Sequence, residues 1–182
     1  MIIGKKILRF KTLDSTNDEA RRQISAGAGE GIGIVTESQT KGRGKPGSSW
    51  QSPKGNLYFS AVVKPYKNPK DLSPITLIGA LAARTLIIKL SKLPVVIKWP
   101  NDLLVHGKKI AGILTERLPS GHIIIGIGIN INVVPDKMKG TATSLKAEKK
   151  KNFDLKKGEK ILIDELNREY LHLLLPGKFA NI

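Results

Sequence analysis

The stretch from residue 95 to residue 116 constrains the fold most, because apolar runs there enclose a dense group of polar residues. Residues 95–97 are β-branched, which is typical of a strand, and Pro100 ends that strand because proline has no N–H to donate to a neighbour. Two apolar runs follow, at 103–105 and 110–115, with a His-Gly pair between them. Glycine tolerates the positive φ of a tight turn, so these runs predict the two arms of a β-hairpin.

The predicted hairpin brings charged side chains together. Folding back at His106 and Gly107 places Lys109 near Asp102, and Lys98 lies in the same short stretch. A carboxylate beside lysines suits both the handling of phosphate and the activation of an amine. An ordinary hairpin with solvated charges would contain the same residues, so this segment alone leaves both interpretations open.

The chain carries a large excess of positive charge. It has 31 Lys and Arg against 15 Asp and Glu in 182 residues, a formal net charge of +16. Such an excess predicts an acidic partner, and nucleic acid, nucleotide phosphates or an acidic protein would each satisfy it. The length suits one well-cored domain.

Residue types that the chain lacks exclude several kinds of site. With no cysteine, disulfides, thiolate nucleophiles and cysteine-ligated metals are excluded, and a reducing cytoplasm is favoured. The histidines share no ligand spacing, so we expect no metal held by the protein's own side chains. The first residues lack the order of a signal peptide, and no run reaches about 18 uninterrupted apolar residues. We therefore expect a cytoplasmic protein with no membrane partner.

Hydrophobic periodicity predicts the remaining elements. The helix at 71–93 is expected to be capped by Ser73, with Pro74 in its first turn, and to cover one face of the sheet. A lysine-rich linker is expected over 146–160, before a last amphipathic helix at 159–175. We also expect a helix that starts near residue 14 and fades from residue 25, and strands at 6–13, 32–36, 56–63, 110–118 and 122–132.

Three short polar residues, Ser15, Thr16 and Asn17, lie where the first strand gives way to the first helix. Capping of the helix by Ser15 or Thr16 is the simpler interpretation. The same side chains would also line a site for a polar ligand, and the local pattern does not separate the two.

The loop from Glu37 to Trp50 is rich in glycine and basic residues and is predicted to be mobile. Its glycines formally match a dinucleotide-binding fingerprint, but Pro46 and the residues after it do not continue as a helix. A phosphate-binding P-loop is also rejected, because Ser48 stands where lysine is needed. We expect a cationic loop that closes over an anion and offers Trp50 as a stacking face, with a solvated surface loop as the alternative.

Glycines interrupt the isoleucine-rich strand at 122–132. Glycine weakens a strand unless something approaches its backbone closely, which here would be a ligand or another chain. The strand is also apolar on both faces at its start. We expect such an edge to be covered by a two-fold partner in a homodimer.

Five polar motifs follow one another along the chain: Asp14-Ser15-Thr16-Asn17; Gln39 with Gly42-Arg43-Gly44-Lys45, Gly47 and Trp50; Lys98-Trp99-Pro100-Asn101-Asp102; Lys109-Ile110-Ala111-Gly112-Ile113-Leu114; and Gly126-Ile127-Gly128-Ile129-Asn130. In this order they resemble the catalytic domain of biotin protein ligases, within the biotin/lipoate ligase superfamily. The resemblance covers about residues 6–145 and, through the last helix, most of the chain.

The resemblance implies an adenylate-forming enzyme. Biotin and ATP would give biotinyl-5'-AMP and pyrophosphate, and a lysine of a biotin carboxyl carrier protein, with an acidic carrier domain, would then take the biotinyl group. Mg²⁺ would accompany the phosphates rather than occupy a preformed cage. Arg43 and Lys109 would neutralise the biotin carboxylate and the α-phosphate, and Asp102 would orient and deprotonate the acceptor lysine.

The resemblance also implies two sets of binding residues. For biotin these are Ser15, Thr16, Asn17, Gln39, Gly42, Arg43, Gly44, Lys45, Lys109 and Gly112. For ATP they are Arg43, Lys45, Trp50, Lys98, Asn101, Lys109 and Asn130. Many members have arginine where this chain has Lys45, which keeps the charge but loses the bidentate fork.

We therefore predict an α/β fold of the α+β type, a single domain over residues 1–182 whose central mixed β-sheet is flanked by helices on one side. Compared with the family, we expect neither the N-terminal DNA-binding domain, and hence no DNA partner, nor the small C-terminal β-barrel. A lipoate or octanoate ligase is the alternative within the superfamily. A non-catalytic biotin-binding or nucleic-acid-binding module is the alternative from another class.

Overall fold

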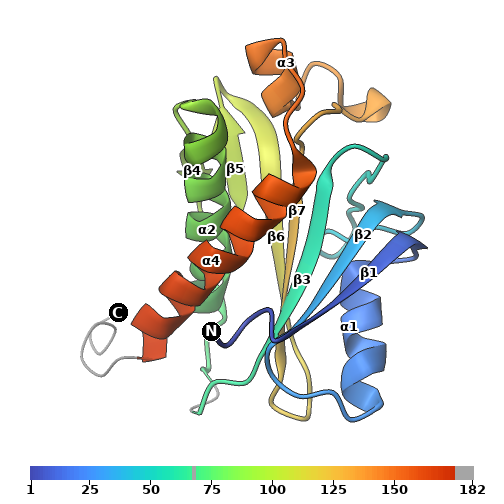
Figure 1. The fold of residues 1–182 in the computed structure, drawn as a ribbon, viewed down its shortest axis with the longest axis vertical. Helices are drawn as coiled ribbons and strands as arrows, with labels where there is room; N and C mark the ends of the chain where they lie inside the picture. The colour runs from blue at the N-terminus through green and yellow to red at the C-terminus, as the bar shows by residue number, and fades with distance from the viewer. Residues whose placement is uncertain (67–68, 175–182) are drawn as a thin grey trace.

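The computed structural model describes residues 1–66 and 69–174, which form one mixed sheet with helices against it (Figure 1). Within these residues the sheet has seven strands in the order β1-β2-β3-β7-β6-β5-β4. β1 and β2 are parallel, and the other neighbouring strands are antiparallel. The strands are β1 Lys6–Leu13, β2 Ile32–Gln39, β3 Leu57–Val63, β4 Val96–Lys98, β5 Asp102–Val105, β6 Lys108–Arg117 and β7 Ile123–Ile129.

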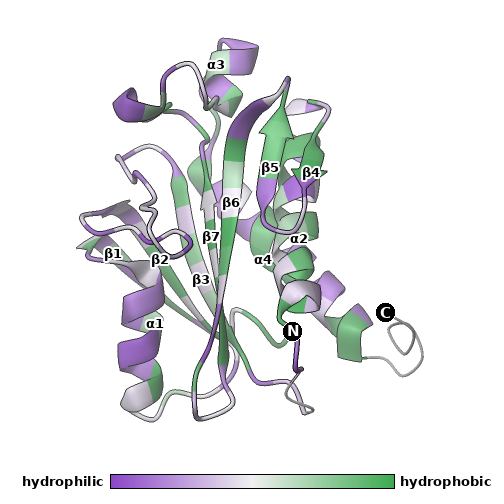
Figure 2. Ribbon diagram, turned by 180° about the vertical axis from the view of Figure 1, so that it is seen from behind, coloured by the Kyte–Doolittle hydropathy of each residue, from purple (hydrophilic) through white to green (hydrophobic). Residues whose placement is uncertain are grey.

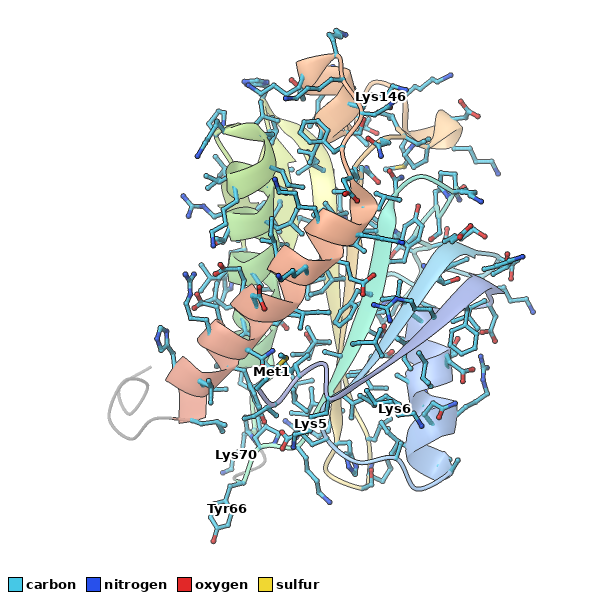
Figure 3. All side chains as sticks on the ribbon, viewed as in Figure 1. Met1, Lys5, Lys6, Tyr66, Lys70 and Lys146 are labelled. Atoms are coloured by element: carbon cyan, nitrogen blue, oxygen red, sulfur yellow. The ribbon has the colours of Figure 1, made fainter. Side chains whose placement is uncertain are left out.

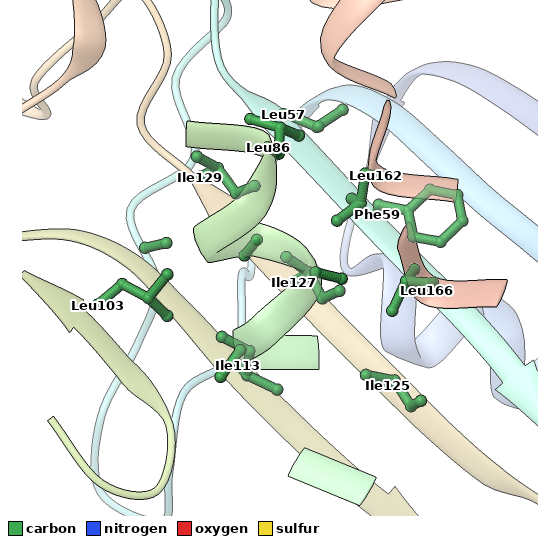
Figure 4. Close-up of a cluster of buried hydrophobic side chains, with 14 of the residues drawn as sticks. Leu57, Phe59, Leu86, Leu103, Ile113, Ile125, Ile127, Ile129, Leu162 and Leu166 are labelled. Carbon is green, nitrogen blue, oxygen red and sulfur yellow. The ribbon is translucent and has the colours of Figure 1, made fainter. Parts of the chain in front are cut away.

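The helices cover both faces of the sheet, which corrects the expectation of helices on one side. They are α1 Thr16–Ser25, α2 Ser73–Ser91, the 3-10 turn η1 Asp136–Met138, α3 Leu145–Lys149 and α4 Leu155–Leu174. α2 and α4 pack on one face, where Leu86 and Leu166 share a buried cluster with Phe59 (Figure 4). The mostly hydrophilic α1 lies on the other face, with Ala20 against Ile34 (Figure 2). Two covers are needed because the central strands carry apolar residues on both faces.

β7 lies in the middle of the sheet and not at its edge. It pairs with β3 on one side and with β6 on the other, and all seven of its residues are buried. The edges of the described sheet are β1 and β4. The expectation of a homodimer through an unpaired strand at 122–132 is therefore wrong in its premise, because this chain itself covers both sides of the strand.

The predicted capping residue is confirmed at the start of α1 but not at the start of α2. Ser15 caps α1 as expected, accepting a hydrogen bond from the backbone N–H of Asp18 at 3.4 Å. Ser73 does not cap α2, because it is already the first helical residue. Asp71 instead accepts hydrogen bonds from the N–H and the hydroxyl of Ser73, both at 2.9 Å. A carboxylate two residues upstream thus supplies the acceptor that a capping serine would offer.

The lysine-rich segment at 146–160 is more helical than expected. It contains most of α3 and the first turn of α4, which starts four residues before the predicted Glu159. Its lysines lie on the exposed side, while Gly158 faces α2 at Leu90, so charge and helix are compatible. At the other end α4 is described to Leu174, and the predicted end at residue 175 lies outside the described residues.

α2 is long and apolar enough, by length and composition alone, to cross a membrane. Its apolar residues are accounted for by burial against the sheet, since Ile75, Ala82, Leu86 and Ile87 are all fully buried there. This is the arrangement of a core helix.

Candidate active site

A cleft of about 430 Å³ opens on the α1 side of the sheet. Its floor is formed by β6 and β7, and its walls by the start of α1, the loop after β2 and the segment 135–142. The predicted site residues that line it are Ser15, Thr16, Asn17, Gln39, Arg43, Gly44, Lys45, Trp50, Asn101, Asp102, Lys109, Gly112 and Asn130. Residues from five separate motifs thus meet in one place.

Two predicted site residues lie outside the cleft lining. Lys98 is exposed on β4 at the edge of the sheet, although its Cα pairs with that of Asp102. Gly42 is buried, and a side chain there would meet the backbone oxygen of Trp50 at 2.3 Å. Gly42 accepts a hydrogen bond at its carbonyl from the Trp50 N–H at 2.9 Å, so it shapes the loop that carries Arg43 and Trp50.

The glycines of the floor let side chains of the same chain lie directly on the sheet. A Cβ at Gly126 would be 2.2 Å from the Asn17 Oδ1, and a Cβ at Gly128 would be 2.4 Å from the Trp50 Nε1. Gly112 would meet the same indole ring at 2.9 Å. Close approach to Gly126 and Gly128 is confirmed, but side chains of the same chain, Asn17 and Trp50, make it, where the sequence predicted a ligand or another chain.

One end of the cleft is a network of small polar groups. Gln39 Oε1 accepts hydrogen bonds from the Thr16 N–H at 2.8 Å and from its hydroxyl at 3.2 Å, and Gln39 Nε2 donates to Ser52 Oγ at 2.7 Å. Ser60 Oγ lies 2.8 Å from Thr16 Oγ1 and 2.6 Å from Asn17 Oδ1. The motifs did not include Ser60, and the signal that could have found it is a hydroxyl in an otherwise apolar strand, since a buried hydroxyl needs a partner.

Arg43 forms ion pairs at the entrance to this polar end. Its guanidinium donates to Asp18 Oδ1 at 2.6 Å and to Glu116 Oε1 at 2.7 Å. Burial lowers the pKa of Arg43, but the hydrogen bond to Asp18 and the charge of Glu116 more than offset this and leave the pKa above its ordinary value. Glu116 also accepts from Asn17 Nδ2 at 2.7 Å and from Arg21 at 3.0 Å. It is the acidic centre of this end, and the motifs did not identify it.

The other end of the cleft contains the ion pair that the hairpin predicted. Lys109 Nζ lies 2.8 Å from Asp102 Oδ1, and Asn101 Nδ2 donates to the same oxygen at 3.0 Å. The turn has positive φ at both His106 (49°) and Gly107 (76°), as a tight hairpin requires. The Lys109 ammonium also lies 5.3 Å from the centre of the Trp50 ring, which places a cation beside an aromatic face.

Asn130 offers an unsatisfied acceptor. The residue is 2 % exposed, and its Nδ2 donates to the Thr143 carbonyl at 3.1 Å. Its Oδ1 is buried and has no hydrogen-bond partner within the described part of the chain. A buried amide oxygen without a partner is costly, so a donor from a ligand is the natural complement.

The segment after β7 forms a wall that the motifs did not predict. Pro135, Met138 and Ala142 line the cleft beside Asn130. Their residue types carry no chemical signal, and they come together through η1 and the turn after it. A cleft with cations, a carboxylate, amides and an apolar wall can hold a ligand that is part apolar and part anionic.

Residues 9–130 match the model of the biotin/lipoate A/B protein ligase family. The chain belongs to this family. The resemblance and the fold class expected from the sequence are thereby confirmed. What the site residues do within the family's chemistry remains a prediction.

Individual relatives agree with the family match. The chain is 37% identical over 155 residues to a bifunctional ligase/repressor BirA of Bacillus subtilis, covering 79% of this chain and 47% of that protein. It is 35% identical over 130 residues to a biotin–[acetyl-CoA-carboxylase] ligase of Paracoccus denitrificans, covering 68% of this chain and 53% of that protein. The chain thus spans about half the length of the curated relatives it matches.

Among solved structures, the chain is similar to the biotin protein ligase of Aquifex aeolicus in complex with biotin and ATP. The TM-score is 0.83 at 31% identity, over 93% of this chain and 72% of that one. A biotin protein ligase of Leishmania major in complex with biotinyl-5-AMP is also similar, with a TM-score of 0.76 at 32% identity over 89% of this chain and 73% of that one.

Proposed function

We propose that this chain is an ATP-dependent biotin protein ligase. It would join biotin to the α-phosphate of ATP, releasing pyrophosphate, and then transfer the biotinyl group from biotinyl-5'-AMP to a carrier lysine, releasing AMP. The main observation in support of this proposal is that Arg43, Lys109 and Asp102 line the same cleft. The relative of known structure with biotin and ATP bound supports the same ligands here.

In the first step a biotin carboxylate oxygen attacks the α-phosphorus, and the bond from phosphorus to the pyrophosphate oxygen breaks. Both reactants are anionic, so their approach needs positive charge. Lys109 is placed to supply it at the phosphate. In this proposal Arg43 supplies positive charge at the biotin carboxylate. That carboxylate would compete with Asp18 and Glu116 for the Arg43 guanidinium.

In the second step the carrier lysine attacks the acyl carbon, and AMP leaves with the phosphate oxygen. The attacking amine must first lose a proton, because its ordinary pKa lies near 10.4. Asp102 is the carboxylate at this end of the cleft, and Asn101 and Lys109 hold it in place. We assign it the task of orienting the amine and accepting its proton.

The two ends of the cleft divide the substrates. The hydroxyls and amides of Ser15, Thr16, Asn17 and Gln39 suit the ureido group of biotin, whose rings are otherwise apolar. At the other end Asn130 Oδ1 suits an amino or hydroxyl group of the nucleoside, and Trp50 covers that region. Mg²⁺ would bind with the phosphates, as it usually does in nucleotide sites, and the described residues contain no group of three or more His, Cys, Asp or Glu side chains that could hold a metal ion.

The partner and setting follow from the proposed reaction. The acceptor is a biotin carboxyl carrier protein, in keeping with relatives named for acetyl-CoA carboxylase. A carrier with an acidic surface matches the net charge of +16. We propose that the reaction takes place in the cytoplasm, where ATP is available and the reducing environment suits a chain without cysteine. DNA is not a partner in this proposal, and a homodimer stays a prediction that no longer rests on β7.

Exchange of labelled pyrophosphate into ATP tests the proposal. Biotin, lipoate and octanoate are supplied separately, and exchange is expected with biotin at a rate at least about a hundredfold above the other two, because only biotin carries a ureido group for the polar end. Faster exchange with lipoate or octanoate would identify the other branch of the family. No exchange with any acid, together with tight biotin binding, would identify a binding module.

A further inference from the structure

The segment 141–143 supports the backbone of Lys109. The Lys109 N–H donates to the Thr141 carbonyl at 3.0 Å, and the Lys109 carbonyl accepts from the Thr143 N–H at 2.9 Å. The pairing of β5 with β6 shifts register at this point, between Leu103 and Leu104. The segment therefore forms an isolated β-bridge with Lys109 where the hairpin ladder is irregular, and it fixes the position from which Lys109 reaches Asp102.

The same segment orients Asn130. The carbonyl of Thr143 accepts the hydrogen bond from Asn130 Nδ2 at 3.1 Å. A carbonyl can accept only from the amide nitrogen, so this contact assigns the two ends of the side chain and leaves Oδ1 as the free acceptor. A shift of Thr143 would therefore displace both the Lys109 backbone and the Asn130 amide, because each is hydrogen-bonded to it.

Glu148 holds Thr143 from behind. The Thr143 hydroxyl donates to Glu148 Oε1 at 2.5 Å, and Glu148 Oε2 lies 3.0 Å from His106 Nδ1 at the hairpin turn. Thr143 is 3 % exposed, and the Glu148 side chain is also largely covered. Neither Thr143, Glu148 nor His106 lines the cleft, so an effect of these residues on ligand binding has to pass through the residues that they hold.

We infer that Glu148 is a positioning residue for the nucleotide end of the cleft, acting through Thr143 on Lys109 and Asn130. The inference rests on the proposed function for its nucleotide and extends it to a residue outside the cleft. It assigns α3, which carries Glu148 and is capped by Ser144, the role of anchoring the segment 141–143 to the hairpin.

Two pairs of variants separate positioning from general stability. Thr143→Val removes the hydroxyl while keeping the shape, and Thr143→Ser keeps the hydroxyl. Glu148→Ala removes the acceptor, and Glu148→Gln keeps an acceptor for Thr143. We expect Thr143→Val and Glu148→Ala to raise the KM for ATP about tenfold, the effect of one charge-assisted hydrogen bond, with the KM for biotin changed less than about twofold. Thr143→Ser and Glu148→Gln should restore the KM for ATP to within about threefold of the parent.

The control is Glu169→Ala, which removes a carboxylate from α4 that pairs with Arg168. It should leave both KM values unchanged. Equal increases in the KM for ATP and for biotin, or a lower Tm with neither KM altered, would overturn the inference. If the parent exchanges pyrophosphate with no acid, the proposed function fails, and calorimetric titration with ATP still tests the inference. ATP should then bind more weakly to Glu148→Ala and Thr143→Val than to the parent and Glu169→Ala, and equal affinities would overturn it.

Discussion

Asp102 and Lys109 form one ion pair, yet in the proposed mechanism Lys109 acts in adenylate formation and Asp102 acts in transfer to the carrier lysine. Both side chains are partly exposed, 24% and 28%, so the pair is open to ligand on one side. A pair that is held between two strands of a hairpin costs little to orient when substrate arrives. The two residues are therefore best separated by measuring adenylate formation and carrier labelling independently.

Lys109→Ala should slow adenylate formation about a hundredfold, because removing one preorganised cationic donor costs roughly 3 kcal/mol of transition-state stabilisation. Biotin should still bind, since its ring contacts lie at the other end of the cleft. Lys70→Ala is the matched comparison, because Lys70 is exposed and outside the cleft. Single-turnover formation of biotinyl-5'-AMP measures the effect, and comparable losses in both variants would contradict the assignment.

Asp102→Asn should slow carrier labelling more than adenylate formation. The amide keeps the shape of the side chain but is a poor proton acceptor, so the acceptor lysine stays protonated for longer. Supplying preformed biotinyl-5'-AMP isolates the second step. Labelling at the parent rate would reject the role of Asp102 as a base, and equal losses in both steps that extra Mg²⁺ reverses would favour a role in positioning the metal.

At the scale of elements, α1 connects the core to the polar end of the cleft. Its first residues, Thr16 and Asn17, line the cleft, and its start is tied to the strand before it through Asp14. Arg22 donates to both oxygens of Asp14, at 3.0 and 2.7 Å, and the Ser15 N–H donates to Asp14 Oδ1 at 2.7 Å. These contacts lower the pKa of Asp14 from 3.8 to about 2, with the hydrogen bond from Arg22 as the largest cause.

Asp14→Asn should destabilise the protein in a way that depends on pH. A carboxyl whose pKa is lowered by folding stabilises the fold above its unfolded pKa of 3.8, and that contribution is lost as pH falls toward its folded value of about 2. The decrease in Tm caused by the substitution should therefore be full at pH 7 and shrink between about pH 4 and pH 2. Thermal unfolding of variant and parent across this range measures it, and a difference independent of pH would contradict the role of the ion pair.

For the whole molecule, the net charge of +16 acts on the encounter with the carrier rather than on the chemistry. Exposed lysines occur at both ends of the molecule, with Lys146 on α3 at one end and Lys5 and Lys70 at the other (Figure 3). α3 lies at the end that carries the cleft wall. Its lysines are therefore better placed than those at the far end to meet an acidic carrier.

Raising salt from about 50 to about 300 mM should slow carrier labelling several-fold and change adenylate formation little, because screening weakens attraction between exposed charges at a distance. At low salt Lys146→Gln should slow labelling more than Lys70→Gln, which makes the same change in net charge at the far end. Equal sensitivity of the two steps to salt, or equal effects of the two substitutions, would refute the steering role.

The sequence by itself determined the strands, the helices α1, α2 and α4, and thirteen of the residues that line the cleft. Local chemistry is sufficient for these: β-branched runs make strands, a serine before acidic residues caps α1, and a His-Gly turn folds Lys109 back onto Asp102. The same local rules indicated that something lies close to the glycines of β7. They could not say what, because the Asn17 and Trp50 side chains arrive from distant parts of the chain.

Tertiary structure decided the position of each strand and helix, and the contacts that hold the cleft residues in place. β7 is a central strand because β3, which is far from it in sequence, pairs with the side that the local hairpin with β6 leaves open, and pairing between distant strands leaves no local mark. Helices cover both faces because residues from separate strands form two apolar surfaces. The contacts of Glu116 with Arg43 and of Glu148 with His106 depend on the same long-range closure, since an isolated acidic residue in a sequence carries no sign of the partner that folding gives it.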